Sequence, residues 1–152
     1  MAHGVFSEAE LRSRCEIMLE NYCKTIVIEG NTMVPMARGQ ILPAVERFTA
    51  DIAKNASAKK AFNETLTCFY ENGLVRKLSE LTDTIAVRVG ALEKALQKAA
   101  AAEDIFAESV VIRDDVLSAM EALRAPCDEA EALTAKAYWP FPNYADLLFS
   151  VQ

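Results

Sequence analysis

The feature that most constrains the fold is an unbroken apolar period in the middle of the chain. From residue 74 to residue 99, apolar side chains recur every three or four positions for seven turns, which is the spacing of one face of an α-helix. No stretch alternates with period two over a useful length, so no sheet is predicted. The 25 alanines, against five glycines and five prolines, favour helix in the rest of the chain. The members of the central stripe are Leu74, Leu78, Leu81, Ile85, Val89, Leu92, Leu96 and Ala99.

The first third of the chain also has helical spacing, with one start signal and two interruptions. Ser7 and Glu10 fit a capping box, in which each side chain satisfies a backbone amide of the other residue. Gly30 and Pro35 predict a kink or short break near residues 30–35. Pro43 predicts a second bend, because proline removes a helical hydrogen bond. The apolar positions on the first helix face are Leu11, Cys15, Met18, Leu19, Tyr22 and Ile26.

The region before the central stripe is predicted to hold a short helix of its own. Residues 55–57 indicate a break, after which Ser57 caps the next helix. Asn72 and Gly73 form a typical C-terminal signal, so we expect this helix to end there. Its apolar positions are Phe62, Leu66 and Phe69.

A last helix is predicted from the end of the central stripe to Ala137. Glu103 and Asp104 mark its start, because acidic side chains are favourable at a helix N-terminus. Pro126 is expected to kink or split it.

These signals predict one helical domain over residues 1–152. Long helices with short connections pack as antiparallel bundles. Residues 138–144 differ in kind, because they hold two prolines and four aromatic residues, and proline keeps the preceding residue out of the helical region. The predicted fold class is therefore all-α, an antiparallel bundle of three to four long helices with an extended aromatic and proline-rich C-terminal tail, a strap over residues 138–152.

Charge and composition exclude several function classes. The net charge is −6, and residues 103–152 hold 3 basic and 10 acidic residues, so a cationic nucleic-acid surface is not expected. No run of about 18–20 apolar residues could span a membrane, and the start lacks a secretory signal, so we expect a cytoplasmic protein. The cysteines form no CxxC pair, and all four are predicted to be small apolar packing residues, namely Cys15, Cys23, Cys68 and Cys127.

Catalytic and metal-binding patterns are weak. The single histidine, His3, lies near the terminus, and no glycine-rich phosphate loop or nucleophile elbow is present. A di-metal bundle would need Glu-x-x-His pairs, which do not occur. The clustered carboxylates are therefore interpreted as a solvated face, with a metal-dependent enzyme as the lesser alternative, and they are Asp114, Asp115, Asp128, Glu129 and Glu131.

Two segments are candidates for binding another protein. Met33 and Met36, with Ile41, form either a core stripe or a soft groove for a partner. The tail is either a strap folded over the end of the bundle or a docking segment, and it can be both, since aromatic residues are enriched at interface cores. The candidate interface residues of the tail are Trp139, Pro140, Phe141, Pro142, Tyr144, Leu147, Leu148 and Phe149.

Two blocks near the ends of the chain carry a resemblance to a known family. Residues 14–26 read RCEIMLENYCKTI and lead through IEGNTM and MA to QILPA at residues 40–44. This block resembles the start of the C-terminal region of type III glutamine synthetases, with its pattern R-x-E-I-x-L-E-x-Y-x-K, I-E-x-x-T-M and M-A-x-x-Q-I-x-P-A. Residues 139–149 read WPFPNYADLLF and look like the chain terminus of that family, W-P-x-P-x-Y-x-D-L-L-F.

The resemblance implies a function that the chain does not perform by itself. The family makes glutamine from glutamate and ammonia with ATP and Mg²⁺ or Mn²⁺, through a γ-glutamyl phosphate, in large ring oligomers. The ligands of ATP, metal and glutamate lie on an upstream catalytic domain whose motifs are absent here, so no catalytic, cofactor-binding or metal residue is carried over. The chain is then expected to be an inactive C-terminal domain with an artificial or truncated start at Met1. Its expected partners are its own catalytic domain and neighbouring subunits of a homo-oligomer.

One alternative of a different class is a free-standing helical adaptor that acts by protein binding. An upstream reading frame for a catalytic domain would favour the synthetase, and an in-frame stop before Met1 would favour the adaptor. In either case, a partner of the acidic last third is expected to present Lys or Arg.

Overall fold

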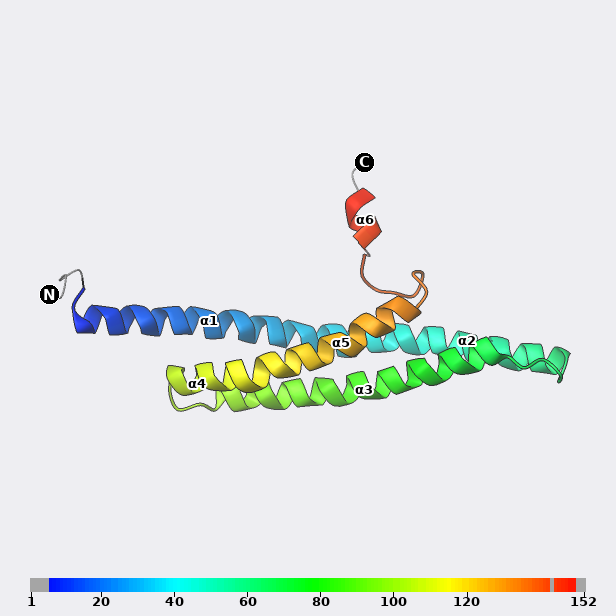
Figure 1. The fold of residues 1–152 in the computed structure, drawn as a ribbon, viewed down its shortest axis with the longest axis horizontal. Coiled ribbons are helices and arrows are strands. Elements are labelled where there is room, and N and C mark those ends of the chain that lie inside the picture. The colour runs from blue at the N-terminus through cyan, green and yellow to red at the C-terminus, as the bar shows by residue number, and fades with distance from the viewer. Residues whose placement is uncertain (1–5, 143, 150–152) are drawn as a thin grey trace.

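The computed structural model describes residues 6–142 and 144–149, which contain helices and no strands. Three long helical segments run back and forth along one axis, and a short helix projects from the last of them (Figure 1). The predicted all-α bundle is thereby confirmed. In chain order the elements are α1 (Glu8–Met36), the π-helical turn η1 (Ala37–Ile41), α2 (Leu42–Phe62), α3 (Phe69–Ala100), α4 (Ile105–Val111), the π-helical turn η2 (Ile112–Val116), α5 (Leu117–Leu133) and α6 (Tyr144–Phe149).

The core lies along α3, which packs against α2 and α5, while α1 packs against α4. The predicted central stripe is buried from Leu78 to Ala99, and Leu74 is half-buried. Each large aliphatic side chain that is fully buried contributes about 1.5–3 kcal/mol relative to an exposed one. This shared core therefore holds the three segments together.

Two of the predicted helix starts, at Ser7 and Asp104, are confirmed by their hydrogen bonds. The Glu10 amide donates to Ser7 Oγ over 3.3 Å, and the Ser7 amide donates to Glu10 Oε2 over 2.7 Å. At the start of α4, the Ala107 amide donates to Asp104 Oδ1 over 2.8 Å. These three contacts satisfy amides that have no partner within the helix.

Of the kink or short break predicted between Gly30 and Pro35, the break is wrong, because the helix continues from α1 into α2. Gly30 is buried against α3, and a Cβ added to it would lie 3.0 Å from Leu96 Cδ2, so this glycine permits close packing of two helices. The departure from regular α-helix is the π-helical turn η1, where the Leu42 amide donates to the Ala37 carbonyl. Such a turn accommodates an extra residue within a continuous helix. Pro43 follows it as the second residue of α2.

The predicted short helix between residues 57 and 73 is also wrong. α2 runs through residues 55–57, where Ser57 Oγ donates to the Ala53 carbonyl over 3.0 Å instead of capping a new helix. Asn72 and Gly73 lie within α3. The turn is at residues 63–68, and it ends at Cys68, which takes a left-handed conformation with φ 47°.

The last helix differs from its prediction at both Pro126 and Ala137. α5 passes unbroken through Pro126, since burial of Leu123 and Cys127 beside it offsets the cost of a proline in a helix. The helix ends at Leu133, because Thr134 adopts extended angles. The tail follows as a non-helical segment to Pro142, and Tyr144, predicted to be extended, begins α6.

The two ends of the bundle leave apolar side chains exposed. The first half of α1 reaches beyond the α3–α4 connection at one end, and the α2–α3 hairpin reaches beyond α5 at the other (Figure 1). Cys15 is exposed, so its predicted packing role is wrong, whereas the other three cysteines are buried. We call four exposed residues on one face of α1 the N-terminal stripe, namely Leu11, Cys15, Met18 and Tyr22.

Candidate functional site

The start of the tail is held on the bundle by Tyr138, which sequence reasoning did not include among the candidate interface residues. Its ring lies 5.2 Å from that of Phe48, and its hydroxyl donates to Asp51 Oδ2 over 2.7 Å. This hydrogen bond, with a weaker one from Lys54, lowers the pKa of Asp51 below its ordinary value, and it raises the pKa of Tyr138. The contact fixes where the tail crosses the bundle.

Next to this anchor lies an apolar cavity of about 190 Å³, which we call the strap groove. Trp139 and Phe141 form its outer wall, with their rings 6.3 Å apart in an edge-to-face arrangement. Exposed Asp128 and Glu131 border it together with Arg124. The apolar residues that line it are Met33, Met36, Ala37, Ile41, Leu123, Cys127, Trp139 and Phe141.

The strap groove collects only part of the predicted interface. Met33, Met36, Trp139 and Phe141 meet there, although the sequence blocks that hold them are far apart. Pro140 and Pro142 are exposed beside it. Leu147 and Leu148 are exposed on α6, which points away from the bundle (Figure 1). The side chains of Tyr144 and Phe149 lie outside the described part of the structure.

The cysteine in the groove is not activated for chemistry. Burial raises the pKa of the Cys127 thiol to about 11, so the thiol is protonated at neutral pH. Burial also raises the pKa of Cys23. A thiolate is the nucleophilic form of cysteine, and neither site favours it.

The clustered carboxylates of the last third are exposed or half-buried, and most are paired within the chain. Asp114 pairs with Arg113 over 2.7 Å, which lowers the pKa of Asp114, and Asp115 pairs with Lys98 over 2.6 Å. Within residues 6–142 and 144–149, no group of three His, Cys, Asp or Glu side chains is placed to hold a metal ion. The remaining pairs are Asp128 with Arg124 over 3.4 Å and Glu129 with Lys77 over 2.7 Å.

A second surface lies at the hairpin tip, which we define as residues 59–72. Phe62 and Phe69 are 90% and 86% exposed, and Tyr70 and Leu66 are exposed as well. The spacing of Phe62, Leu66 and Phe69 predicts a helical stripe, but these residues surround a turn and are exposed instead of packing in a core. The sequence held one sign of this exposed turn. The large apolar residues there are interleaved with the polar residues Asn63, Thr65 and Thr67.

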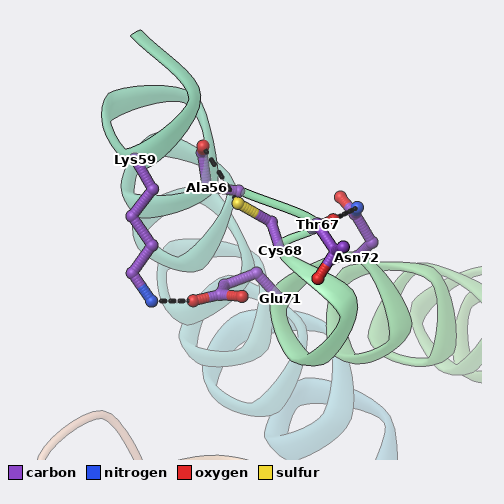
Figure 2. A network of polar contacts seen from close by, with 6 residues as sticks. All are labelled: Ala56, Lys59, Thr67, Cys68, Glu71 and Asn72. Atoms are coloured by element: carbon purple, nitrogen blue, oxygen red, sulfur yellow. Dashed lines mark hydrogen bonds and ion pairs between the residues drawn. The ribbon is translucent and has the colours of Figure 1, made fainter. Parts of the chain in front are cut away.

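Polar contacts hold the hairpin tip in one conformation (Figure 2). Lys59 on α2 pairs with Glu71 on α3, whose side chain is 9% exposed, and this pair lowers the pKa of Glu71. Cys68 Sγ lies 3.6 Å from the Ala56 carbonyl, and Asn72 Nδ2 donates to the Thr67 carbonyl over 3.2 Å. The tip is therefore a braced turn that presents aromatic side chains.

No helix in the described ranges is long and apolar enough to cross a membrane. Comparison with known proteins finds similarity of the chain to one family. A family model described as the glutamine synthetase C-terminal domain matches residues 1–60.

Relatives match the chain well beyond those residues. A glutamine synthetase of Butyrivibrio fibrisolvens is 32% identical over 99% of the chain and 21% of that protein. A type-3 glutamine synthetase of Dictyostelium discoideum is 28% identical over 96% of the chain and 20% of that protein, and a glutamine synthetase of Bacteroides fragilis is 25% identical over 96% and 21%. The chain thus spans about a fifth of the length of these relatives. The resemblance read from its two end blocks is confirmed, because the chain matches the C-terminal domain of glutamine synthetases and fits the C-terminal region of the type III enzymes.

Proposed function

We propose that the chain acts as the C-terminal accessory and assembly domain of a type III glutamine synthetase. The observation that carries this proposal is the N-terminal stripe, an apolar helix face whose side chains are exposed in the described structure, most strongly at Leu11 and Met18. Exposed apolar faces of this kind are typical of protein interfaces. The catalytic domain of the same enzyme and its neighbouring subunits are the expected cover.

In this proposal the chemistry belongs to the rest of the enzyme. ATP and a divalent metal would serve the ligation of ammonia to glutamate in a cytoplasmic homo-oligomer. The described residues of this chain offer no cluster of ligands for the metal, and we assign them no step of the reaction. The isolated chain is expected to be inactive.

The strap is the second surface expected to support assembly. Trp139 and Phe141 rest half-buried on the bundle, whereas Leu147 and Leu148 project from α6 and are 61% and 56% exposed. A helix with two exposed leucines is suited to pack against a neighbouring subunit. The bundle would then hold the base of the strap while its end contacts the partner.

Deletion of residues 139–152 from the full-length enzyme tests this role. The truncation keeps Tyr138 and its contacts with Phe48 and Asp51, so the bundle itself should remain folded. We expect a smaller oligomer in sedimentation velocity and lower synthetase activity. A control carrying Val87→Ser, at a position 71% exposed on α3, should keep both properties. A truncated enzyme with full oligomer size and activity would refute the assembly role of the tail.

A further inference from the structure

The hairpin tip has the properties of an anchor for another protein. Its two phenylalanines are almost fully exposed, although their transfer out of water would be favourable by about 1.5–3 kcal/mol each. The contacts of Figure 2 already fix the turn that carries them. Binding through a preorganised aromatic element avoids much of the entropy cost of ordering a loop. The tip therefore offers exposed aromatic side chains on a braced turn, without a pocket of their own.

The strap groove has the complementary shape. Its volume of about 190 Å³ exceeds the roughly 150 Å³ of an apolar cavity that can hold a benzene ring. Methionine side chains from α1, together with Trp139 and Phe141, make a wall that can adapt to an aromatic guest. The groove can therefore receive one phenylalanine ring.

The charges around the two surfaces are also complementary. Lys60, next to the exposed aromatics, makes no ion pair within residues 6–142 and 144–149. At the groove, Arg124 is paired with Asp128, which leaves Glu131 as a carboxylate with no cation of its own in the described structure. Opposite charges at the rim of an interface steer association and set its register.

From these observations we infer that the hairpin tip of one copy docks in the strap groove of a second copy, with Phe62 or Phe69 in the cavity and Lys60 facing Glu131. The two surfaces lie at different places along the bundle (Figure 1), so the contact is heterologous. Each copy then uses its tip for one neighbour and its groove for another, which builds a ring or a filament. The inference rests on the proposed assembly role, for which it names one pair of contacting surfaces.

Sedimentation velocity of the 152-residue chain over a concentration series tests the contact. We expect species larger than the monomer whose fraction rises with concentration. The double substitution Phe62→Ser and Phe69→Ser should raise the dissociation constant about tenfold or more, because exposed aromatic anchors dominate such interfaces. Phe106→Ser, at a phenylalanine 44% exposed on α4, is the matched control and should leave association unchanged. Circular dichroism confirms that each variant remains helical.

Exchange of the charges at Lys60 and Glu131 provides a second test. It can restore binding in a mixture of variants, which a substitution that removes an apolar side chain cannot do. Lys60→Glu and Glu131→Lys should each weaken association severalfold. An equal mixture of the two variants should associate like the wild-type chain. When the two variants alternate along the assembly, every tip–groove contact pairs opposite charges, either in the native order or with the two charges exchanged. A mixture that associates no better than either variant overturns the inference. So does a wild-type chain that is monomeric throughout, or a Phe106→Ser control that weakens association as much as the tip variant.

These outcomes are separable from those of the proposed function. A monomeric chain would remove the tip–groove contact while leaving the deletion of residues 139–152 in the full-length enzyme as an independent test of the tail. An intact full-length assembly after that deletion would refute the role of the tail regardless of how the isolated chain behaves.

Discussion

In the middle of the bundle, Ile85 and Leu92 are completely buried in a core shared by three helical segments, whereas at the two ends Met18 is 72% and Phe62 is 90% exposed. The residue types are similar, and both regions are helical or bounded by helix. The difference is the number of helices that reach each region, because α1 and the hairpin outrun their neighbours (Figure 1). An apolar period thus identifies a face that needs a partner, and only the packing of the chain decides whether that partner is internal.

This difference explains why the ends are the candidate interaction surfaces. Scattered exposed apolar residues are common on proteins and need no explanation. Here they form a row along α1 and a group around one turn, and the group is braced by polar contacts. Substitution of matched residues in the two regions tests whether the exposed residues differ from the buried ones in their contribution to the fold.

The largest expected effect is that of Leu92→Ala in the middle of the bundle. The leucine is fully buried, so its truncation should lower the free energy of unfolding by about 2–5 kcal/mol through lost burial and the cavity left behind. The same change at Leu11, which is 54% exposed, should stay within about 0.5 kcal/mol. Urea denaturation followed by circular dichroism measures both. Equal losses at the two positions would mean that the N-terminal stripe is buried in solution.

The glycines provide a comparison of backbone packing. Gly30→Val should cost about 1–3 kcal/mol, because its side chain would collide with Leu96 across the interface of α1 and α3. Gly73→Ala should instead stabilise the fold by about 0.5–1 kcal/mol, since no atom lies within 4 Å of the added Cβ and alanine favours helix. Thermal unfolding curves distinguish the two signs. A tolerated valine at Gly30 would contradict the close approach of these helices.

The Lys59–Glu71 pair makes the hairpin tip sensitive to acid. The folded state lowers the pKa of Glu71, so the stabilisation is complete above the ordinary glutamate pKa and is lost as pH falls through the lower, folded value. Glu71→Gln should therefore flatten the acid side of the stability–pH profile. Substitution of Glu64, an exposed acid of the same turn, by Gln is the control, and its profile should match the wild type. Unfolding titrations at several pH values measure the difference.

The smallest expected effect concerns the anchor of the tail. Tyr138→Phe keeps the ring against Phe48 but removes the hydroxyl that donates to Asp51. The pKa of Asp51 should rise toward its ordinary value, because its largest stabilising contact is lost. Carboxyl NMR titration of Asp51 measures this shift. An unchanged pKa would show that the tail does not contact α2 in solution.

The sequence predicted those features that depend on local chemistry. The central stripe from Leu78 to Ala99 is buried as expected, and the caps at Ser7 and Asp104 form the expected hydrogen bonds. The helix breaks predicted from Gly30, Pro35 and Pro126 do not occur. At these positions tertiary packing and a π-helical turn keep the helix continuous against its local propensity.

The candidate site could be predicted only in part, because it is built from distant segments. Met33 and Met36 were identified as a possible groove and Trp139 and Phe141 as a strap, but no spacing rule indicates that the two meet. The hairpin tip was missed because Phe62, Leu66 and Phe69 fit a helical period, and the period hides a turn that ends at the left-handed Cys68. The interface role of these residues stays a prediction.

The most direct test of the account is the reactivity of Cys15, the cysteine of the N-terminal stripe. In the 152-residue chain Cys15 is exposed and should react rapidly with a maleimide, while buried Cys23, Cys68 and Cys127 serve as internal controls. In the assembled full-length glutamine synthetase, we expect Cys15 to be protected, because another part of the enzyme would cover the stripe. Mass spectrometry after a timed pulse of reagent gives both rates. Equally rapid labelling of Cys15 in the chain and in the assembled enzyme would contradict the claim that this surface is a contact.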